Sequence, residues 1–240
     1  MILDGTKKFL SDKLSGKNAV IGLSGGIDSA FVVTLLVDSI ERNRIFAIYM
    51  PDSNSPEEDL TDVERICKFN SISFETIPID MIIKEFSKAL NLEDSKVIGN
   101  LKSRVRMSIL YSVANRNNGI VVGTTNKSEY LTGYFTKFGD GGCDIEPIIG
   151  IYKTQIWELS KVMGLPKSII EKKPSARLWA EQTDEEDLGI SYSELDRILI
   201  KFEESGEFPE SREGKIVSSL YLSSMHKRKL PYSPGEDPAS

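Results

Sequence analysis

Short runs of consecutive apolar residues alternate along this chain with longer segments in which apolar residues recur every three or four positions. The apolar runs at 18–21, 44–50 and 119–123 predict buried strands, and strict alternation at 72–77 predicts another. The longer segments predict helices, and these cover residues 4–15, 30–43, 56–69, 79–90, 97–117, 152–163, 191–205 and 213–226.

This alternation of strands and helices predicts an α/β fold. Parallel strands joined by right-handed helical crossovers give a doubly wound, mainly parallel sheet with helices on both faces, a Rossmann-like arrangement. Ligands of such sheets bind beyond the carboxyl ends of the strands. The sequence contains no repeat and no long linker, so we expect a single domain over residues 1–240, with a flexible tail at 231–240 and a mobile loop at 171–187.

Composition narrows the classes of function. Hydrophobic residues make up 40% of the chain and charged residues 28%, which is typical of soluble globular proteins. No apolar run is long enough to span a membrane, and the N-terminus lacks the apolar core of a signal peptide, so a cytoplasmic protein without membrane contact is expected. The net charge of −6 disfavours a nucleic-acid partner. Cys67 and Cys143 lie too far apart in sequence to form a paired metal motif.

The segment IGLSGGIDSA at 21–30 joins the first predicted strand to its helix and carries the main chemical signal. A strand, a glycine turn and a helix N-terminus direct free N–H groups and the positive end of the helix dipole at one point, which suits an anion. Gly25 and Gly26 permit positive φ and the close approach of a phosphate, while Ser24 and Ser29 add hydroxyl donors. Asp28 would repel a phosphate unless a cation lay between them, so it implies Mg²⁺.

This loop differs from a Walker A sequence, because no Gly-Lys-Ser/Thr follows its glycines. It resembles the SGGxDS pyrophosphate loop of the ATP pyrophosphatases, which cleave ATP to AMP and pyrophosphate. An ordinary glycine turn capped by Ser or Asp is the alternative interpretation. The resemblance implies a fold of the adenine nucleotide α-hydrolase type and a loop that binds ATP through Gly22, Leu23, Ser24, Gly25, Gly26, Ile27, Asp28 and Ser29.

Later segments narrow the resemblance to the NAD synthetases. The matching segments follow the family's order and are NLKSRVRM at 100–107, GTTNKSE at 123–129, GYFTKFGDG at 133–141, QTDE at 182–185 and HKR at 226–228. By this resemblance the chain is identified as a member of the ammonia-dependent NAD synthetases. Membership implies that deamido-NAD, ATP and ammonia are converted to NAD, AMP and pyrophosphate through an adenylated nicotinate, in the final step of NAD biosynthesis.

The resemblance also implies roles for single residues, none of them a general acid or base. It gives ATP contacts to Thr124, Lys153 and Ser175, Mg²⁺ ligation to Asp28 and Glu129, and deamido-NAD contacts to Arg104, Lys137, Asp144, His226 and Lys227. Four of these residues also have a plainer structural alternative. Thr124 could cap a helix, Glu129 could complement a helix dipole, Lys153 could be a surface residue and Ser175 a turn residue.

Other residues near these segments have open interpretations. Arg106 is expected to be structural. Tyr134, Phe135 and Phe138 either stack on a substrate ring or pack at the base of their loop. His226 is the only histidine, so a metal site built from several histidines is excluded.

Partners follow from the same resemblance. The 240 residues contain no amidohydrolase domain, so free ammonia is the expected nitrogen donor, with a separate glutaminase partner left open. Relatives of this type are homodimers with the dinucleotide near the subunit interface, so a homodimer is expected. The apolar faces of 97–117 and 213–225 are candidate interfaces, and either could equally belong to the core. Two other functions stay open: another pyrophosphate-loop enzyme that amidates its substrate or thiolates RNA, and a non-catalytic nucleotide-binding module.

Overall fold

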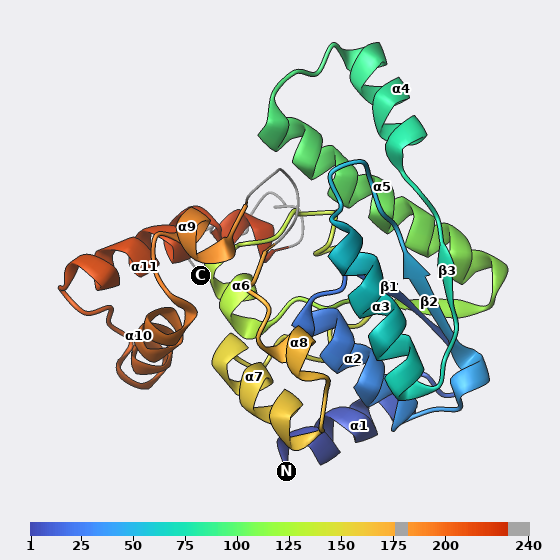
Figure 1. Ribbon diagram of the computed structural model, residues 1–240. Helices are drawn as coiled ribbons and strands as arrows, with labels where there is room; N and C mark the ends of the chain where they lie inside the picture. Colours follow the sequence, from blue (N-terminus) through green and yellow to red (C-terminus); the bar gives the residue numbers. More distant parts are fainter. Residues whose placement is uncertain (176–181, 230–240) are drawn as a thin grey trace, which may run out of the picture.

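Four parallel strands form the centre of the structure, a computed structural model that describes residues 1–175 and 182–229. The strands are β1 (Asn18–Leu23), β2 (Ile45–Tyr49), β3 (Phe74–Thr76) and β4 (Gly119–Val122), in the spatial order β3-β2-β1-β4 (Figure 1). β1 pairs with both β2 and β4, so the loop that follows β1 leaves from the middle of the sheet. The four predicted strands and their parallel arrangement are confirmed.

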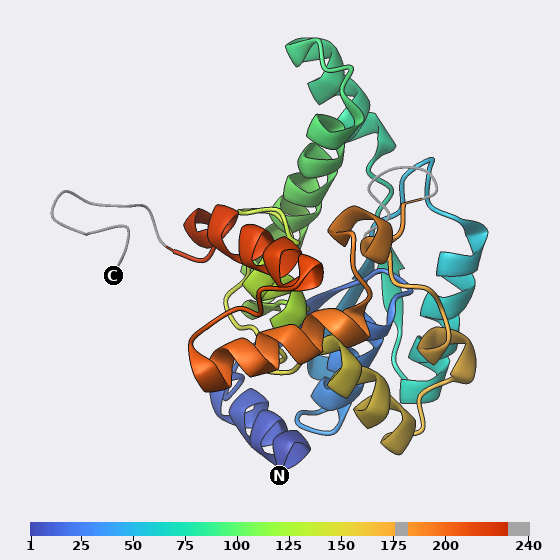
Figure 2. The same cartoon turned by 90° about the vertical axis from the view of Figure 1, so that its left-hand side faces the viewer.

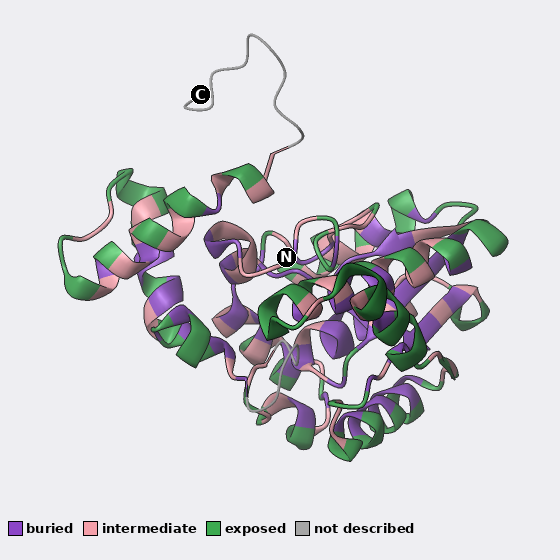
Figure 3. Ribbon diagram, turned by 90° about the horizontal axis from the view of Figure 1, so that it is seen from above, coloured by how far each residue is buried: buried purple, intermediate pink, exposed green. Residues whose placement is uncertain are grey.

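Helices cover both faces of this sheet, as expected. Ala19, Ile21 and Leu23 of β1 pack with one group of helices, whereas Val20 packs on the opposite face. Buried residues gather between the layers and exposed residues outline the outer helix faces (Figure 3). The first face carries α1 (Ile2–Lys13), α2 (Ile27–Val37), α3 (Glu57–Asn70), α7 (Lys153–Val162) and α8 (Lys167–Ile170), and the second carries α4 (Asp80–Leu90) and α5 (Ser95–Arg116).

A third apolar cluster builds a helical group beside the sheet. Tyr192 and Leu195 are fully buried within it, and Val217 closes it from the following helix. Figures 1 and 2 show this group on one side of the sheet, while α4 and the adjoining end of α5 project from the body. The group contains α6 (Lys127–Thr132), α9 (Asp184–Leu188), α10 (Tyr192–Ser205), α11 (Arg212–Ser223) and the 3₁₀ turn η2 (Met225–Lys227).

Two predicted segments need correction. The helix predicted at 30–43 ends at Val37, since polar Asp38 and Ser39 follow its buried apolar run, and a separate 3₁₀ turn, η1, forms at Arg42–Arg44. The predicted mobile loop is ordered at its end, where α9 begins at Asp184, because Leu188 is buried in the third cluster.

Two of the predicted segments lie partly or wholly outside the described residues. Residues 176–181 of the predicted loop and the predicted tail at 231–240 lie outside the described residues. Within residues 1–175 and 182–229, no helix is both long enough and apolar enough to cross a membrane.

Candidate functional site

The SGGIDS loop lies at the carboxyl end of β1, where α2 begins. Gly25 has a φ of +74°, and a Cβ atom there would lie 2.7 Å from the backbone oxygen of Asp59. Gly26 has an extended backbone with a φ of −93°, so the predicted need for positive φ holds at Gly25 alone of the two. Ser29 Oγ donates to the Gly26 carbonyl at 3.1 Å, and Ser24 Oγ accepts from the Gly26 N–H at 3.2 Å. The two hydroxyls therefore brace the loop.

Asp28, Glu129 and Lys153 meet at this edge of the sheet from three different helices. Lys153 Nζ lies 2.5 Å from Asp28 Oδ2 and 3.7 Å from Glu129 Oε1. Its side chain is 3% exposed, so Lys153 is not a surface lysine. Burial alone lowers the pKa of Lys153, but the charges of Asp28 and Glu129 outweigh it and raise that pKa. Burial and the charge of Asp28 hold the pKa of the Glu129 carboxyl well above its usual range.

Asn126 connects the two carboxylates. Its Oδ1 accepts from the Glu129 N–H at 3.0 Å, and Glu129 Oε2 accepts from the Asn126 N–H at 3.2 Å, which makes a capping box at the start of α6. Its Nδ2 donates to Asp28 Oδ1 at 3.2 Å. Glu129 is therefore both a helix-capping residue and a neighbour of the Asp28–Lys153 pair. The sequence pattern Asn-x-x-Glu at 126–129 could have revealed this box.

The chemistry of these carboxylates fits Mg²⁺. Asp28 and Glu129 offer hard oxygen ligands that converge on one cationic group, the Lys153 ammonium. Mg²⁺ often takes one or two protein carboxylates and completes its shell with waters and substrate phosphates. Within the described part of the chain, no group of three or more His, Cys, Asp or Glu residues is arranged to hold a metal. A two-carboxylate site is thus the arrangement that these residues could provide.

A pocket beyond the strand ends collects the residues that were predicted to bind ATP. Gly25 alone of them is missing from its lining, although its neighbour Asp59 is part of that lining. Asn126 caps α6, so Thr124 is not the helix cap. Ser175 Oγ donates to the Gln182 carbonyl at 2.6 Å. The pocket wall includes Gly22, Leu23, Ser24, Gly26, Ile27, Asp28, Ser29, Thr124, Glu129, Lys153 and Ser175.

Four of the five residues predicted for deamido-NAD gather around the loop at 133–138, outside that lining. Arg104 Nη2 donates to the Lys137 carbonyl at 3.4 Å, and Lys137 Nζ donates to the His226 carbonyl at 2.5 Å. Lys227 Nζ donates to the carbonyls of Gly133 and Phe135 at 2.7 and 2.9 Å. Turn η2 and this loop are thereby joined through cationic side chains that pair with backbone oxygens.

Asp144, the fifth, has a different set of partners. Its Oδ2 accepts from the Val121 N–H of β4 at 2.8 Å, and its Oδ1 accepts from the Tyr111 hydroxyl of α5 at 3.1 Å. The side chain is exposed at the edge of the sheet. Burial, together with the charge of Asp144, raises the pKa of Tyr111 to about 12, so this phenol stays a donor at neutral pH.

The neighbouring residues divide between packing and the pocket. Arg106 donates to the Met50 carbonyl at 3.0 Å and to Asp52 at 2.9 Å, and it also lines the pocket. The Phe135 ring stacks on the Tyr130 ring, with 6.1 Å between the two ring centroids. Phe138 is 57% exposed. Tyr134 lines the pocket, and its hydroxyl donates to a carboxylate of α9 at 2.8 Å.

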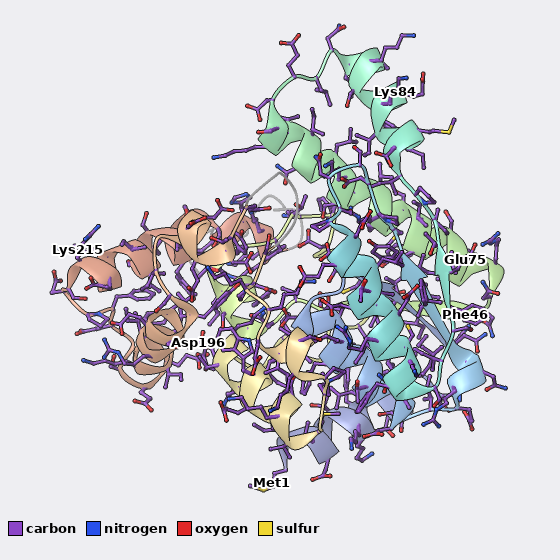
Figure 4. The ribbon with its side chains drawn as sticks, in the orientation of Figure 1. Met1, Phe46, Glu75, Lys84, Asp196 and Lys215 are labelled. Atoms are coloured by element: carbon purple, nitrogen blue, oxygen red, sulfur yellow. The ribbon has the colours of Figure 1, made fainter. Side chains whose placement is uncertain are left out.

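Sequence reasoning gave no role to several acidic and basic residues in or near the pocket, among them Lys172, Asp184 and Asp196. Lys172 Nζ donates to Asp59 Oδ1 at 2.8 Å and to Asp62 Oδ2 at 2.7 Å, which fastens the segment before Ser175 to α3. Asp184 lines the pocket from α9. Asp196 lies on α10, on the side that contacts α6 and α7 (Figure 4). The QTDE segment contains Asp184, but nothing in its pattern indicated that this carboxylate would be buried.

Comparisons with known proteins show the family to which this chain belongs. The sequence profile described as NAD synthase matches residues 2–231. The NH(3)-dependent NAD(+) synthetase of Thermoplasma acidophilum is 46% identical over 231 residues, which cover 96% of each chain. The solved structure of NMN synthetase from Francisella tularensis has a TM-score of 0.90 and 35% identity, and it covers 98% of each chain. The NH3-dependent NAD synthetase from Campylobacter jejuni has a TM-score of 0.84 and 30% identity, with 97% of this chain and 96% of that chain covered. This chain belongs to the NAD synthase family.

Proposed function

We propose that this protein, as one domain, is an ammonia-dependent NAD synthetase. It would convert deamido-NAD, ATP and ammonia to NAD, AMP and pyrophosphate. The observation that carries the proposal is the convergence of Asp28, Glu129 and Lys153 beside an anion-binding loop at the carboxyl end of β1. The name of the Thermoplasma relative, which specifies NH(3) and NAD(+), supports the choice of nitrogen donor and product.

The reaction has two chemical steps. A nicotinate carboxylate oxygen attacks the α-phosphorus of ATP, and pyrophosphate leaves. Ammonia then attacks the carbonyl carbon of the acyl adenylate, AMP leaves, and the nitrogen loses a proton to become the amide. Catalysis of this kind depends mainly on positioning and on stabilisation of charge at the phosphates.

The residues of the pocket supply both effects. The N–H groups at the start of α2 and the Lys153 ammonium bind the leaving pyrophosphate, and the braced loop keeps those donors in place. Asp28 and Glu129 would hold Mg²⁺, which neutralises phosphate charge when it is bound. Lys172 holds the segment before Ser175 against α3, and Ser175 lines the pocket in which ATP would bind.

Deamido-NAD would bind along the loop at 133–138. Arg104, Lys137 and Lys227 bring positive charge to its pyrophosphate or its nicotinate carboxylate, with His226 beside them, and Asp144 would accept from a ribose hydroxyl. A homodimer belongs to the proposal. On the two candidate helices, Val97 and Leu222 expose apolar side chains that a second subunit could cover, whereas other apolar residues of these helices, such as Val113 and Val217, belong to the core.

The first test is NAD formation from deamido-NAD, Mg-ATP and ammonium, with glutamine replacing ammonium in a parallel tube. NAD and AMP appearing in equal amounts with ammonium alone would support the proposal. A folded protein that binds ATP but makes no NAD with either donor would overturn it. A third tube contains nicotinate mononucleotide, because the Francisella structure with the TM-score of 0.90 is named an NMN synthetase. Faster amidation of the mononucleotide would favour that second function.

A further inference from the structure

Asp184 is a buried carboxylate of the pocket that none of the roles above uses. It is 3% exposed and lines the pocket together with Asp28, Glu129 and Lys153. Its Oδ2 accepts from the Tyr192 hydroxyl at 3.1 Å, but its Oδ1 is buried and has no hydrogen-bond partner among the described residues. A buried carboxylate oxygen without a donor is costly, so a donor for Oδ1 in another state of the enzyme would explain its place in the fold.

The groups nearest to Asp184 limit which donor this can be. The Tyr134 hydroxyl also interacts with the Asp184 carboxylate, but it has a single proton, which it donates to Asp187 Oδ2 at 2.8 Å. The Lys153 ammonium has three N–H donors, and it lies 5.2 Å from the ring centroid of Tyr192, whose hydroxyl bonds to Asp184. Tyr192 therefore lies beside both the lysine and the Asp184 carboxylate, and these two charged residues line the same pocket.

Lys153 now pairs with the two carboxylates that would hold the metal. Its Nζ lies 2.5 Å from Asp28 Oδ2 and 3.7 Å from Glu129 Oε1. A divalent cation bound to the same oxygens would lie within a few ångströms of the ammonium, and repulsion between such charges is strong in a site that excludes water. Metal binding at Asp28 and Glu129 therefore requires the ammonium to move away from Asp28.

We propose that Asp184 is the second partner of the Lys153 ammonium, which pairs with Asp28 when the metal is absent and with Asp184 when Asp28 and Glu129 hold a divalent cation. The inference rests on the proposed function, because it takes its metal ligands from it. In this arrangement Lys153 keeps the two carboxylates neutralised before the metal arrives. Asp184 is then a positioning residue, which holds the lysine charged and near the phosphates after the exchange.

The test is a double-mutant cycle in which Mn²⁺ binding to the nucleotide-free protein is measured. Electron paramagnetic resonance detects the Mn²⁺ that remains free. Lys153→Met should tighten Mn²⁺ binding by about tenfold or more, because a competing cation is gone. Asp184→Asn should weaken binding several-fold while Lys153 is present, and should leave it unchanged in the Lys153→Met background. Glu186→Gln, which changes an exposed carboxylate on the same helix, is the control for a general loss of negative charge.

Two outcomes would overturn the proposed exchange of Lys153 between Asp28 and Asp184 and would leave the metal site itself unaffected. One is unchanged Mn²⁺ affinity in Lys153→Met. The other is an equal loss of Mn²⁺ affinity from Asp184→Asn in the wild-type and Lys153→Met backgrounds, which would show that Asp184 acts on the metal directly. Absence of Mn²⁺ binding in every variant would instead remove the metal assignment itself. NAD formation, which is measured separately, distinguishes that result from a failure of the proposed function.

Discussion

The Ser128 hydroxyl donates a hydrogen bond of 2.5 Å to the carboxylate of Asp196, and this contact ties α10 to the start of α6. The other oxygen of Asp196 accepts from the N–H and the hydroxyl of Thr154 at 2.9 and 2.8 Å, at the start of α7. Ser128 also accepts from the Lys153 N–H at 3.0 Å. Glu129 and Lys153 are direct chain neighbours of these contacts, so Asp196 fixes the positions of two site residues without reaching the pocket.

Replacing Asp196 by Asn should weaken both the fold and the reaction. In the wild type, the Asp196 carboxylate accepts from Ser128 and Thr154. The asparagine amide would direct an N–H group at one of these donors, which should lower the free energy of unfolding by about 1–3 kcal/mol. We expect a lower kcat for NAD formation as well, because α6 and α7 would no longer hold Glu129 and Lys153 in register. Urea denaturation and steady-state kinetics measure the two effects. Glu158→Gln on the exposed face of α7 should change neither quantity, and a wild-type kcat in Asp196→Asn would refute the positioning role.

The pair Asp28→Asn and Glu129→Gln separates metal binding from stability. Each should lower the turnover of NAD formation by roughly 10²-fold or more, because each removes a charged oxygen from the phosphate site. The Glu129→Gln variant would still complete the capping box, since a glutamine side chain can accept the Asn126 N–H as the glutamate does. The thermal midpoint of this variant should therefore stay close to that of the wild type. Wild-type rates for both variants at saturating Mg²⁺ would show that the metal assignment is wrong.

The nucleotide loop was predictable from the sequence because its signal is local. A strand, the residues Ser24 to Ser29 and a helix follow one another within 20 positions, and parallel topology then fixes the sheet edge at which the loop lies. Lys153 was predicted through family resemblance, but its partner was not. Asp28 lies 125 positions away, and only the packing of α7 against α2 brings the two together.

Other parts of the site were hidden for the same physical reason. The acidic segment around Asp184 has the composition of a solvated loop, yet Leu188 and Tyr192 are buried in the third cluster and draw it into a helix. Tertiary burial outweighed local propensity there. Asp196 sits in an amphipathic helix, where a charged residue normally marks the solvent face. The sequence pattern alone does not distinguish a buried, fully bonded carboxylate from an exposed one.

Stability should fall with rising pH because of Glu146. Its Oε2 accepts from the Thr125 N–H at 3.1 Å, and a Cβ atom on Gly123 would lie 2.4 Å from its carboxylate, so the group is closely packed. Burial raises the pKa of Glu146 from 4.5 to about 7, although hydrogen bonds from Cys143 and Thr125 act in the opposite direction. The folded protein therefore binds this proton more tightly than the unfolded chain does.

The resulting contribution to stability is fully present below the unfolded pKa and is lost as the pH rises through the folded pKa. Glu146→Gln keeps an oxygen acceptor for Thr125 and removes the titration. We expect the free energy of unfolding of this variant, measured in urea between about pH 5 and pH 8, to fall less with pH than that of the wild type. Glu207→Gln, which changes an exposed carboxylate, should retain the wild-type slope. An unaltered slope in Glu146→Gln would assign the pH dependence to other groups.

Gly25→Ala should distort the nucleotide loop, because both the backbone and the neighbouring helix oppose a side chain there. The φ of +74° is unfavourable for alanine, and the new Cβ would lie 2.7 Å from the Asp59 carbonyl. Asp59 has little freedom to retreat, since Lys172 donates both to Asp59 Oδ1 at 2.8 Å and to the Gly25 carbonyl at 3.4 Å. We expect a loss of about 1–3 kcal/mol in the free energy of unfolding and weaker binding of ATP in calorimetry.

Gly5→Ala should change the free energy of unfolding in the opposite direction from Gly25→Ala. Gly5 lies inside α1, and a Cβ atom there would meet no atom within 4 Å, so alanine should stabilise the protein by about 0.5–1 kcal/mol through the lower conformational entropy of the unfolded chain. ATP binding should be unchanged, because α1 does not line the pocket. If Gly25→Ala bound ATP as tightly as Gly5→Ala, the loop would tolerate displacement, and its close packing against Asp59 would not be what shapes the phosphate site.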